Sequence, residues 1–247
     1  MALIHSFESN GNWLFKRRGP LPAVLFILAL PAIYFTDYST HTASFSYVMN
    51  VLAVLTCIAG FIIRCYTIGT TPKGTSGRNT EQQVAEVLNS TGIYSVVRHP
   101  LYLGNYLMWI GIVFFTESIS FVIIVSLLFW IYYERIMFAE ERFLERKFGD
   151  TYLTWSLNAP AFLPKFSQFR KSNIPFSFKS VLRREYSGAL ATVFGFVYVE
   201  LMIHVFHEHE FRISRNSMII LGIFLLLTII LRSLKHKTHL LDEEGRS

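Results

Sequence analysis

The sequence contains little cysteine and gives no sign of disulfide chemistry. Only two of its 247 residues are cysteine, Cys57 and Cys65, and both stand in one apolar run. On a helix their spacing corresponds to about 12 Å, which is too far for a disulfide to reach. The pair therefore indicates two ordinary buried thiols, without evidence for a thiolate metal site or an oxidising compartment.

Charge is also scarce. Charged residues make up 16% of the chain, whereas hydrophobic residues make up 52%, with 23 phenylalanines and 12 tyrosines. Together with long apolar runs, this composition is typical of an integral membrane protein. The net charge of +6 then does not indicate a nucleic-acid partner, because the Lys and Arg residues of a membrane protein collect in its cytoplasmic loops.

The apolar runs predict an all-α membrane protein with about six transmembrane helices. We place the helices at residues 21–35, 45–68, 101–115, 119–136, 187–206 and 218–234. The loops on one side of this arrangement hold nearly all Lys and Arg residues, which predicts that both termini are cytoplasmic. The basic segment 16–18 resembles the start of a signal peptide, but bulky residues stand where a cleavage site would be, so we expect a retained first span.

Polar segments divide the chain into three predicted regions: 1–68, 69–164 and 165–247. Apolar residues at helical spacing predict a short surface helix over 80–88, and residues 165–184 read as a basic linker. We expect Arg64, at the end of the second span, to extend its charge to the membrane interface. No internal repeat, coiled coil or low-complexity tract is present.

Aromatic and histidine residues near the span ends have ordinary explanations. The aromatic residues are interpreted as interface anchors: Trp13, Tyr34, Tyr132 and Tyr133. The sequence from His204 to Glu210 contains three histidines and two glutamates that could ligate zinc. Because this cluster is predicted on the opposite side from the main motif, an interfacial loop is favoured and no metal site is assigned.

Ionisable residues mark both ends of a predicted helical hairpin, where such groups usually serve a function. Pro100 favours a helix that begins after His99, and His99, Tyr102 and Tyr106 then share one helix face. A tight turn at 116–118 returns the chain. The second helix continues beyond the membrane as a charged amphipathic segment, for about 30 residues or 45 Å in total.

This hairpin is expected to bring Arg98 and His99 opposite Glu140 and Glu141 at the membrane surface. A helix N-terminus beside Arg98 attracts a carboxylate or phosphate, and the glutamates attract a cation. One cleft with both kinds of group suits a zwitterionic ligand. The same charges also fit ordinary pairing on a juxtamembrane helix, and the spacing alone leaves both interpretations open.

The motif Arg98-His99-Pro100-Leu101-Tyr102-Leu103-Gly104-Asn105, followed by Glu140-Glu141, resembles the signature of the isoprenylcysteine carboxyl methyltransferase and phospholipid methyltransferase superfamily. Flanking residues 92–94 and 148–152 also resemble its members, so the resemblance covers about 91–164. The resemblance implies an integral membrane enzyme that uses S-adenosylmethionine. A soluble Rossmann-type methyltransferase is excluded, because the sequence has no Gly-rich βαβ fingerprint.

Site residues follow from this resemblance. It implies that the cofactor-binding residues are Tyr94, Arg98, His99, Tyr102, Gly104, Asn105, Glu140 and Glu141. Among them, Arg98 and the two glutamates are the catalytic candidates. Methyl transfer requires the protein to position donor and acceptor and to exclude water. An ionised phosphate or carboxylate acceptor needs no base, whereas an amine acceptor needs one, for which Glu140 or Glu141 is the candidate.

The expected acceptor is a membrane lipid or a lipidated molecule. The basic linker and the loop 75–79 favour a phosphate-bearing headgroup, since Arg pairs well with phosphate. Two other classes stay open: an NADPH-dependent sterol-type membrane reductase, and a non-catalytic membrane protein or transporter. The mid-chain position of the motif weighs against the first and its intact residues against the second. The compact loops favour a bacterial inner membrane, with the active site on the cytoplasmic side.

Overall fold

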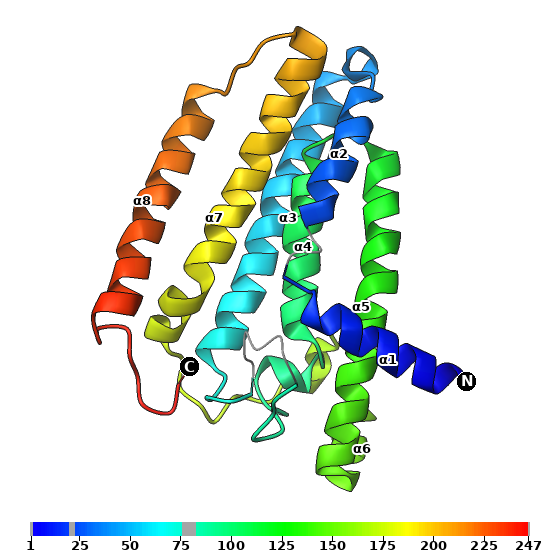
Figure 1. Ribbon diagram of the computed structural model, residues 1–247, viewed down its shortest axis with the longest axis vertical. Coiled ribbons are helices and arrows are strands. Elements are labelled where there is room, and N and C mark those ends of the chain that lie inside the picture. Colours follow the sequence, from blue (N-terminus) through cyan, green and yellow to red (C-terminus); the bar gives the residue numbers. More distant parts are fainter. Residues whose placement is uncertain (1, 20–22, 76–82, 247) are drawn as a thin grey trace.

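A computed structural model describes residues 2–19, 23–75 and 83–246 (Figure 1). Within these ranges the chain forms eight α-helices and no β-strand, which confirms the all-α prediction. The helices are α1 (Leu3–Lys16), α2 (Val24–Tyr34), α3 (Ala43–Gly69), α4 (Pro100–Phe114), α5 (Ile119–Phe148), α6 (Asp150–Ser156), α7 (Phe178–Ile203) and α8 (Arg215–Lys237). The long helices run side by side along the molecule, and α1 crosses them at a steep angle (Figure 1).

Four helices are long and apolar enough to cross a membrane: α3, α5, α8, and α7 with the turn that follows it. The apolar helices α2 and α4 have only 11 and 15 residues, and at 1.5 Å per residue both are shorter than a hydrocarbon core of about 30 Å. All six predicted apolar segments form helices. Residues 21–22, at the start of the first segment, lie outside the described ranges. A count of six crossings is not confirmed.

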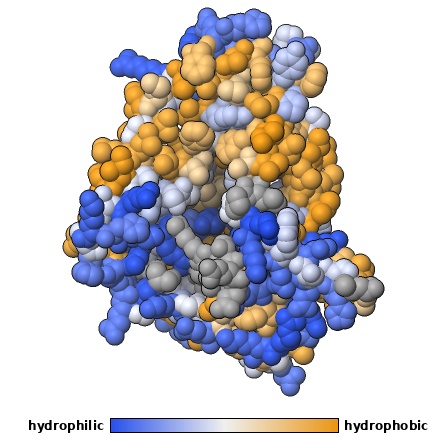
Figure 2. Space-filling model, in the orientation of Figure 1, coloured by the Kyte–Doolittle hydropathy of each residue, from blue (hydrophilic) through white to orange (hydrophobic). Residues whose placement is uncertain are grey.

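Apolar side chains cover the outside of the helical bundle. Figure 2 shows a band of hydrophobic residues between a small hydrophilic region at the top of the molecule and a larger one in its lower part. Helix α8 has no buried residue along its whole length, although its best membrane window has a mean hydropathy of 2.4. Such a surface is stable only in an apolar solvent, which supports an integral membrane protein.

The helices α4 and α5 form the predicted antiparallel hairpin. Pro100 occupies the first position of α4, where its missing N–H is not needed. Thr116 holds the turn, because its hydroxyl donates to the Val113 carbonyl at 2.7 Å and its own carbonyl accepts from the Tyr38 hydroxyl at 2.9 Å. Helix α5 then runs for 30 residues, about 45 Å, and ends at Gly149 with φ of +52°, which suits glycine.

Small residues let α3 and α4 approach each other closely. A Cβ atom added to Gly60 would lie 2.6 Å from the Gly104 carbonyl oxygen, and one added to Gly111 would lie 2.4 Å from the Cys57 sulfur. Both distances are far inside van der Waals contact, so glycine is required at this interface. Cys57 is buried and Cys65 half-buried, and both are free thiols.

The helix α1 lies across α5 and is not predicted from the polar composition of residues 1–19. The Phe7 ring packs edge-on against Phe138 with 5.8 Å between ring centroids. Gly11 is buried in the same contact, where an added Cβ would lie 2.1 Å from the Arg135 carbonyl oxygen. This packing places the segment that follows α1 beside α4 and α5.

The surface helix predicted over 80–88 is wrong for its described part. Residues 83–88 are not helical, whereas residues 80–82 lie outside the described ranges. The physical reason is a competing backbone contact: the Glu86 N–H donates to the Gly74 carbonyl at 3.2 Å instead of to a carbonyl four positions earlier. The segment is therefore held as a loop against the end of α3.

The basic linker predicted over 165–184 ends earlier than expected. Ser177 caps α7, because its hydroxyl accepts from the Ser180 N–H at 3.1 Å. Helix α7 therefore includes Arg184, which is only 8% exposed. A π-helical turn over His204–Glu208 follows α7, so the fifth apolar segment is longer than predicted.

The C-terminal segment returns to the loop after α3. The Lys73 N–H donates to the Gly245 carbonyl at 3.0 Å, and the Arg246 guanidinium donates to the Thr71 carbonyl at 3.0 Å. Both marked ends of the chain lie in the lower half of Figure 1. Helix α3 packs against both α4 and α7, so the regions 1–68, 69–164 and 165–247 share one bundle, and their division stays a prediction.

Candidate active site

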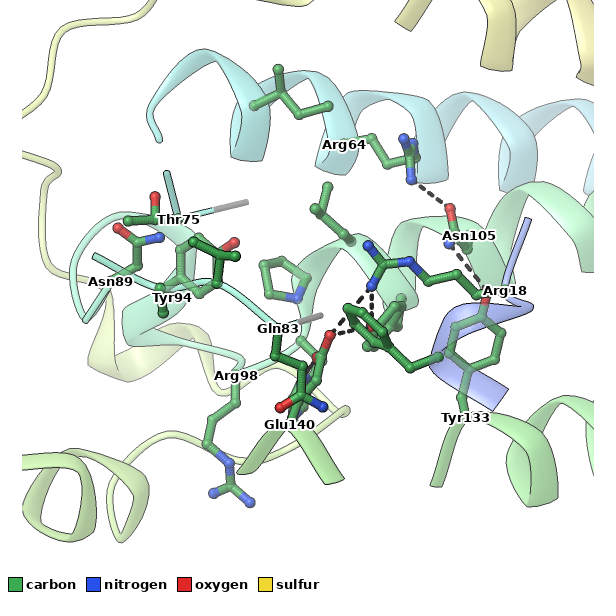
Figure 3. Close-up of a pocket in the computed structure, with 18 of the residues that line it drawn as sticks. Arg18, Arg64, Thr75, Gln83, Asn89, Tyr94, Arg98, Asn105, Tyr133 and Glu140 are labelled. Atoms are coloured by element: carbon green, nitrogen blue, oxygen red, sulfur yellow. Dashed lines mark hydrogen bonds and ion pairs between the residues drawn. The ribbon is translucent and has the colours of Figure 1, made fainter. Parts of the chain in front are cut away.

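A cavity of about 750 Å³ lies between α3, α4, α5 and α7. This volume falls within the range of small-molecule sites, roughly 300–1,000 Å³. Figure 2 shows the front face hollowed between apolar flanks, and Figure 3 shows polar side chains around the cavity. The predicted site residues that line it are Tyr94, Arg98, His99, Tyr102, Asn105, Glu140 and Glu141.

Arg98 joins the start of α4 to α5 and to the end of α6. Its Nε and Nη2 atoms donate to the two carboxylate oxygens of Glu141 at 2.9 and 3.2 Å. Its Nη1 atom donates to the carbonyls of Ser156 and Ala159 at 2.8 and 2.7 Å. A guanidinium engaged in four hydrogen bonds to the protein acts as a clamp that positions Glu141. The catalytic role predicted for Arg98 stays a prediction.

His99 lies between the two glutamates of the motif. Its Nε2 atom is 2.9 Å from a Glu141 oxygen, and its Nδ1 atom is 3.6 Å from a Glu140 oxygen. Burial lowers the pKa of His99, but the hydrogen bonds and charges of the two glutamates outweigh burial and raise the pKa above its ordinary value of 6.5. A protonated imidazole is therefore favoured, and it neutralises part of the paired negative charge.

Glu140 faces the cavity and has partners from two distant segments. It accepts a hydrogen bond from the Tyr102 hydroxyl at 2.6 Å. The Arg18 guanidinium, from the segment that follows α1, reaches the same carboxylate oxygen at 3.5 Å and the Tyr102 hydroxyl at 3.3 Å (Figure 3). Arg18 stands outside the predicted motif, and its only sequence signal is a basic cluster ahead of the first apolar run.

A second polar group lies one helical turn further along α4. Arg64 donates from Nε and Nη2 to both carboxylate oxygens of Glu185 at 2.7 Å, and its Nη1 donates to the side-chain oxygen of Asn105. The amide of Asn105 in turn donates to the Tyr133 hydroxyl at 3.3 Å (Figure 3). The prediction that Arg64 extends to the interface is wrong, because a buried carboxylate on α7 holds it inside.

Tyr133 corrects another expectation. It is only 4% exposed and lines the cavity, whereas the sequence suggested an interface anchor. Its ring stacks on Phe129 with 4.1 Å between centroids. The predicted anchors Trp13 and Tyr34 are 51% and 58% exposed, which suits an interface. Tyr133 is buried in a cluster with Phe15 of α1 and Tyr102 of α4, and this tertiary packing separates it from the exposed aromatic residues.

The start of α4 offers fewer N–H groups to an anion than the sequence predicts. The Arg98 N–H donates to the Pro160 carbonyl at 2.8 Å, and the His99 N–H donates to the Ala161 carbonyl at 3.2 Å. Pro100 has no N–H to offer. These two bonds fix the position of the motif relative to the segment after α6. They also occupy two backbone N–H groups that we expected to donate to an anionic ligand.

Tyr94 and Trp155 form an aromatic wall of the cavity. The Trp155 indole donates to the Tyr94 carbonyl at 3.1 Å, which ties α6 to the turn before the motif. Burial, reinforced by the charge of Glu140, raises the pKa of Tyr94 to about 12. The phenol therefore stays protonated at neutral pH and can donate a hydrogen bond.

Two residues of the motif helix face away from the cavity. A Cβ atom added to Gly104 would lie 2.5 Å from Cγ of Arg64, so Gly104 serves the contact with α3 and positions Arg64. The Tyr106 hydroxyl lies 3.0 Å from the Ser126 hydroxyl, so Tyr106 packs toward α5. Tyr106 shares a predicted helix face with His99 and Tyr102, but only His99 and Tyr102 line the cavity.

The histidines near the end of α7 bind backbone carbonyls. The His204 ring lies 2.8 Å from the Arg212 carbonyl oxygen, and the His207 ring lies 2.8 Å from the Ile33 carbonyl oxygen. Across the described part of the chain, no group of three or more His, Cys, Asp or Glu residues is arranged to hold a metal ion. The two rings therefore fasten the turn after α7 to its neighbours.

Comparison with known proteins agrees with the motif. Residues 48–151 match the family described as phospholipid methyltransferase. A stretch of 78 residues, 32% of this chain, is 30% identical to the protein-S-isoprenylcysteine O-methyltransferase of Schizosaccharomyces pombe and covers 33% of that protein. The central segment is therefore similar to integral membrane methyltransferases. This similarity agrees with the resemblance carried by the motif, and the activity is argued as a proposal below.

Two bacterial proteins also match a part of the chain. A stretch of 98 residues, 40% of this chain, is 35% identical to the nickel-cobalt-cadmium resistance protein NccN of Alcaligenes xylosoxydans xylosoxydans and covers 43% of it. A stretch of 83 residues, 34% of this chain, is 35% identical to the cobalt-zinc-cadmium resistance protein CzcN of Cupriavidus metallidurans and covers 38% of it. The chain thus spans less than half the length of each relative. No solved structure gives a significant match.

Proposed function

We propose that this protein transfers a methyl group from S-adenosylmethionine to the headgroup of a membrane lipid or lipidated molecule. One observation carries the proposal: Glu140 and Glu141 of the methyltransferase motif line a cavity that also has an apolar portion. A polar donor site continuous with apolar space fits a small charged cofactor and an amphiphilic acceptor. Two bacterial relatives favour a bacterial inner membrane as the location, with the cavity mouth toward the cytoplasm.

The chemistry of the site fits the proposed cofactor. S-adenosylmethionine supplies an activated methyl group on a sulfonium and carries an ammonium, a carboxylate and an adenine ring. Glu140, whose side chain is 22% exposed, would attract the cationic groups, and Tyr94, Tyr102 and Trp155 would pack against the adenine ring. The clamp formed by Arg98 holds these groups in place before the ligand binds, which reduces the cost of ordering them.

The two glutamates are proposed to have different roles. Glu141 accepts two hydrogen bonds from Arg98 and one contact from His99, so its lone pairs are largely used and it positions its neighbours. Glu140 accepts one hydrogen bond from the Tyr102 hydroxyl and lines the cavity. If the acceptor is an amine, Glu140 is the base that removes its proton; an ionised phosphate or carboxylate acceptor needs no base.

A phosphate-bearing acceptor is favoured by the position of two arginines. Arg64 and Arg184 line the cavity beyond the motif, and both come from outside the predicted basic loop 75–79, of which residues 76–79 lie outside the described ranges. Guanidinium groups suit phosphate oxygens. The names of the two bacterial relatives refer to metal resistance and state no reaction, so the proposed chemistry does not draw on them.

Calorimetric titration with S-adenosylhomocysteine tests the cofactor assignment. We expect binding by the wild-type protein and at least tenfold weaker binding by Glu140→Gln, because a hydrogen bond to a charged group contributes about 1.5–3 kcal/mol. Glu117→Gln is the matched control. Glu117 also accepts hydrogen bonds, from Ser46 at 2.7 Å and His41 at 2.9 Å, but lies at the far end of the hairpin.

Three results separate the possibilities. Loss of binding in Glu140→Gln but not in Glu117→Gln supports the cofactor site, and a mass increase of one methyl group in an added lipid then identifies the acceptor. Equal weakening in both variants would point to general destabilisation. Absence of binding by folded wild-type protein would reject the methyltransferase proposal, and titration with NADPH would then test the reductase alternative.

A further inference from the structure

The cavity continues beyond the motif between two facing rows of residues. On α4 the row consists of Asn105, Met108, Trp109 and Ile112, and on α7 it consists of Arg184, Glu185, Gly188, Ala191 and Thr192. Residues three and four positions apart share one helix face, so each row follows one side of its helix. Helix α7 lies outside the matched methyltransferase segment 48–151.

Small side chains on α7 leave space opposite the larger residues of α4. Apart from its chain neighbours and the backbone of its own helix, a Cβ atom added to Gly188 would have only one heavy atom within 4 Å, the Glu185 Oε2 atom at 3.8 Å. The next positions of the row, Ala191 and Thr192, are also small. The wall formed by α7 is therefore recessed. The facing wall formed by α4 is apolar where Met108 and Ile112 line the cavity.

The far end of this space is closed. A Cβ atom added to Gly195 would lie 2.6 Å from Cδ1 of Ile112, so α4 and α7 touch at that level. The space between the Asn105 level and Ile112, bounded by Gly188, Ala191 and Thr192, is called the α4–α7 slot below. Ile112 stands seven positions after Asn105, which gives the slot a length of about 10 Å.

The slot also has a side open to the apolar surface. Ala191 is an exposed residue although it lines the cavity, and Phe194, one turn further on, is 54% exposed. Both residues lie in a helix that is long and apolar enough to span a membrane. An occupant can therefore enter sideways from the membrane without crossing the polar end of the cavity.

We propose that the α4–α7 slot holds the apolar chain of the acceptor lipid. The paired Arg64 and Glu185 mark the boundary at which the headgroup stays, and Asn105 lies on the same level toward Glu140. This inference rests on the proposed methyl transfer and adds to it the acceptor class: a lipid with at least one flexible hydrocarbon chain. The second wall of the slot comes from α7, which has no counterpart in the matched segment.

The dimensions of the slot predict how affinity depends on chain length. Each methylene group that leaves water for an apolar site increases affinity about fourfold. Affinity should therefore rise by about fourfold per methylene while the added group fits between Asn105 and Ile112. Beyond the contact of Ile112 with Gly195 the increase should stop or become smaller.

Two homologous series test this dependence. Wild-type protein in amphipol is titrated with n-alkyl phosphates and, separately, with n-alkyl ammonium ions, from butyl to tetradecyl, and displacement of a fluorescent fatty-chain probe is measured. The slope of affinity against chain length measures how much each methylene group contributes to binding in the slot. The difference in affinity between the two series measures the preference for a phosphate or an ammonium headgroup. A slope near zero in both series would overturn the proposal.

Matched glycine substitutions locate the effect. Gly188→Leu should fill the slot and reduce the affinity for octyl and longer chains at least tenfold. Gly222→Leu is the control, because Gly222 lies on α8 and an added Cβ there meets nothing within 4 Å. Ile112→Ala removes the closed end and should move the plateau to longer chains. Unchanged chain-length dependence in both Gly188→Leu and Ile112→Ala would refute the slot.

Titration with S-adenosylhomocysteine separates this inference from the proposed function. Gly188→Leu is expected to retain S-adenosylhomocysteine binding, because Gly188 lies beyond the level of Arg64 and Glu185. Wild-type protein that binds alkyl chains but not S-adenosylhomocysteine would reject the methyl-transfer proposal and, with it, the acceptor role of the slot. Wild-type protein that binds S-adenosylhomocysteine without any dependence on alkyl chain length would reject the slot alone.

Discussion

The ion pair between Arg64 and Glu185 joins α7 to α3, which packs against the motif helix α4. Two parallel hydrogen bonds of 2.7 Å join the guanidinium to the carboxylate, and the Glu185 side chain is only 3% exposed. Glu185→Gln keeps the shape of the side chain and removes its charge. The guanidinium then stays in the cavity wall without a negative partner at that position.

The magnitude follows from the burial of each partner. Breaking a buried pair by removing one partner destabilises a protein by about 3–5 kcal/mol. Because the Arg64 side chain is 19% exposed and keeps its bond to Asn105, we expect Glu185→Gln to cost about 3 kcal/mol. Arg64→Met should cost more, since it leaves the better-buried carboxylate unpaired. Arg64→Met combined with Glu185→Leu should recover stability, because both buried charges are removed.

Reversible unfolding in mixed micelles, followed by circular dichroism as the denaturing detergent increases, measures these differences. Arg183→Met is the control, because its pair with Asp242 has side-chain exposures of 30% and 44%, and such pairs contribute about 0–1 kcal/mol. A loss in Glu185→Gln no larger than in Arg183→Met would refute the reasoning. A double variant less stable than both single variants would show that the buried charges do not dominate.

Two further predictions concern His99 and the glycines between α3 and α4. His99 has a raised pKa in the folded state, so its contribution to stability is fully present below pH 6.5 and is lost as the pH rises through the folded value; the stability difference between wild type and His99→Gln, measured in the same unfolding assay, should shrink above pH 6.5. Gly60→Ala should destabilise by about 1–3 kcal/mol through overpacking, because its Cβ would lie 2.6 Å from a backbone oxygen. Gly222→Ala, which meets nothing, should be neutral or slightly stabilising, and equal effects in both variants would contradict the packing argument.

Much of the fold could be predicted from the sequence because it depends on near neighbours in the chain. The start of α4 after His99 follows from Pro100 at the first helical position. The length of α5 follows from an uninterrupted helical pattern that ends at Gly149. A short turn between two helices forces them to lie antiparallel, so the meeting of His99 with Glu140 and Glu141 could be predicted without coordinates.

Other parts of the site depend on contacts that no local pattern predicts. The residues Arg64 and Glu185 are 121 positions apart, and Arg18 and Glu140 are 122 positions apart. As charges beside apolar runs, Arg18 in its basic cluster and the single Arg64 have the same sequence appearance as any basic residue at a membrane interface. Tyr133 likewise resembles an interface aromatic until its packing against α1 and α4 buries it.

The sequence by itself determined the membrane class, the hairpin, the methyltransferase motif and the pairing across the hairpin, since composition and helical spacing act over short separations along the chain. Only the tertiary structure decided that Arg98 is a clamp, that Gly104 serves the α3 contact, and that α7 forms a wall of the cavity. These outcomes depend on which helix faces meet in space. Many pairings of apolar faces bury similar area, so side-chain size at contacts such as Gly195 with Ile112 selects among them.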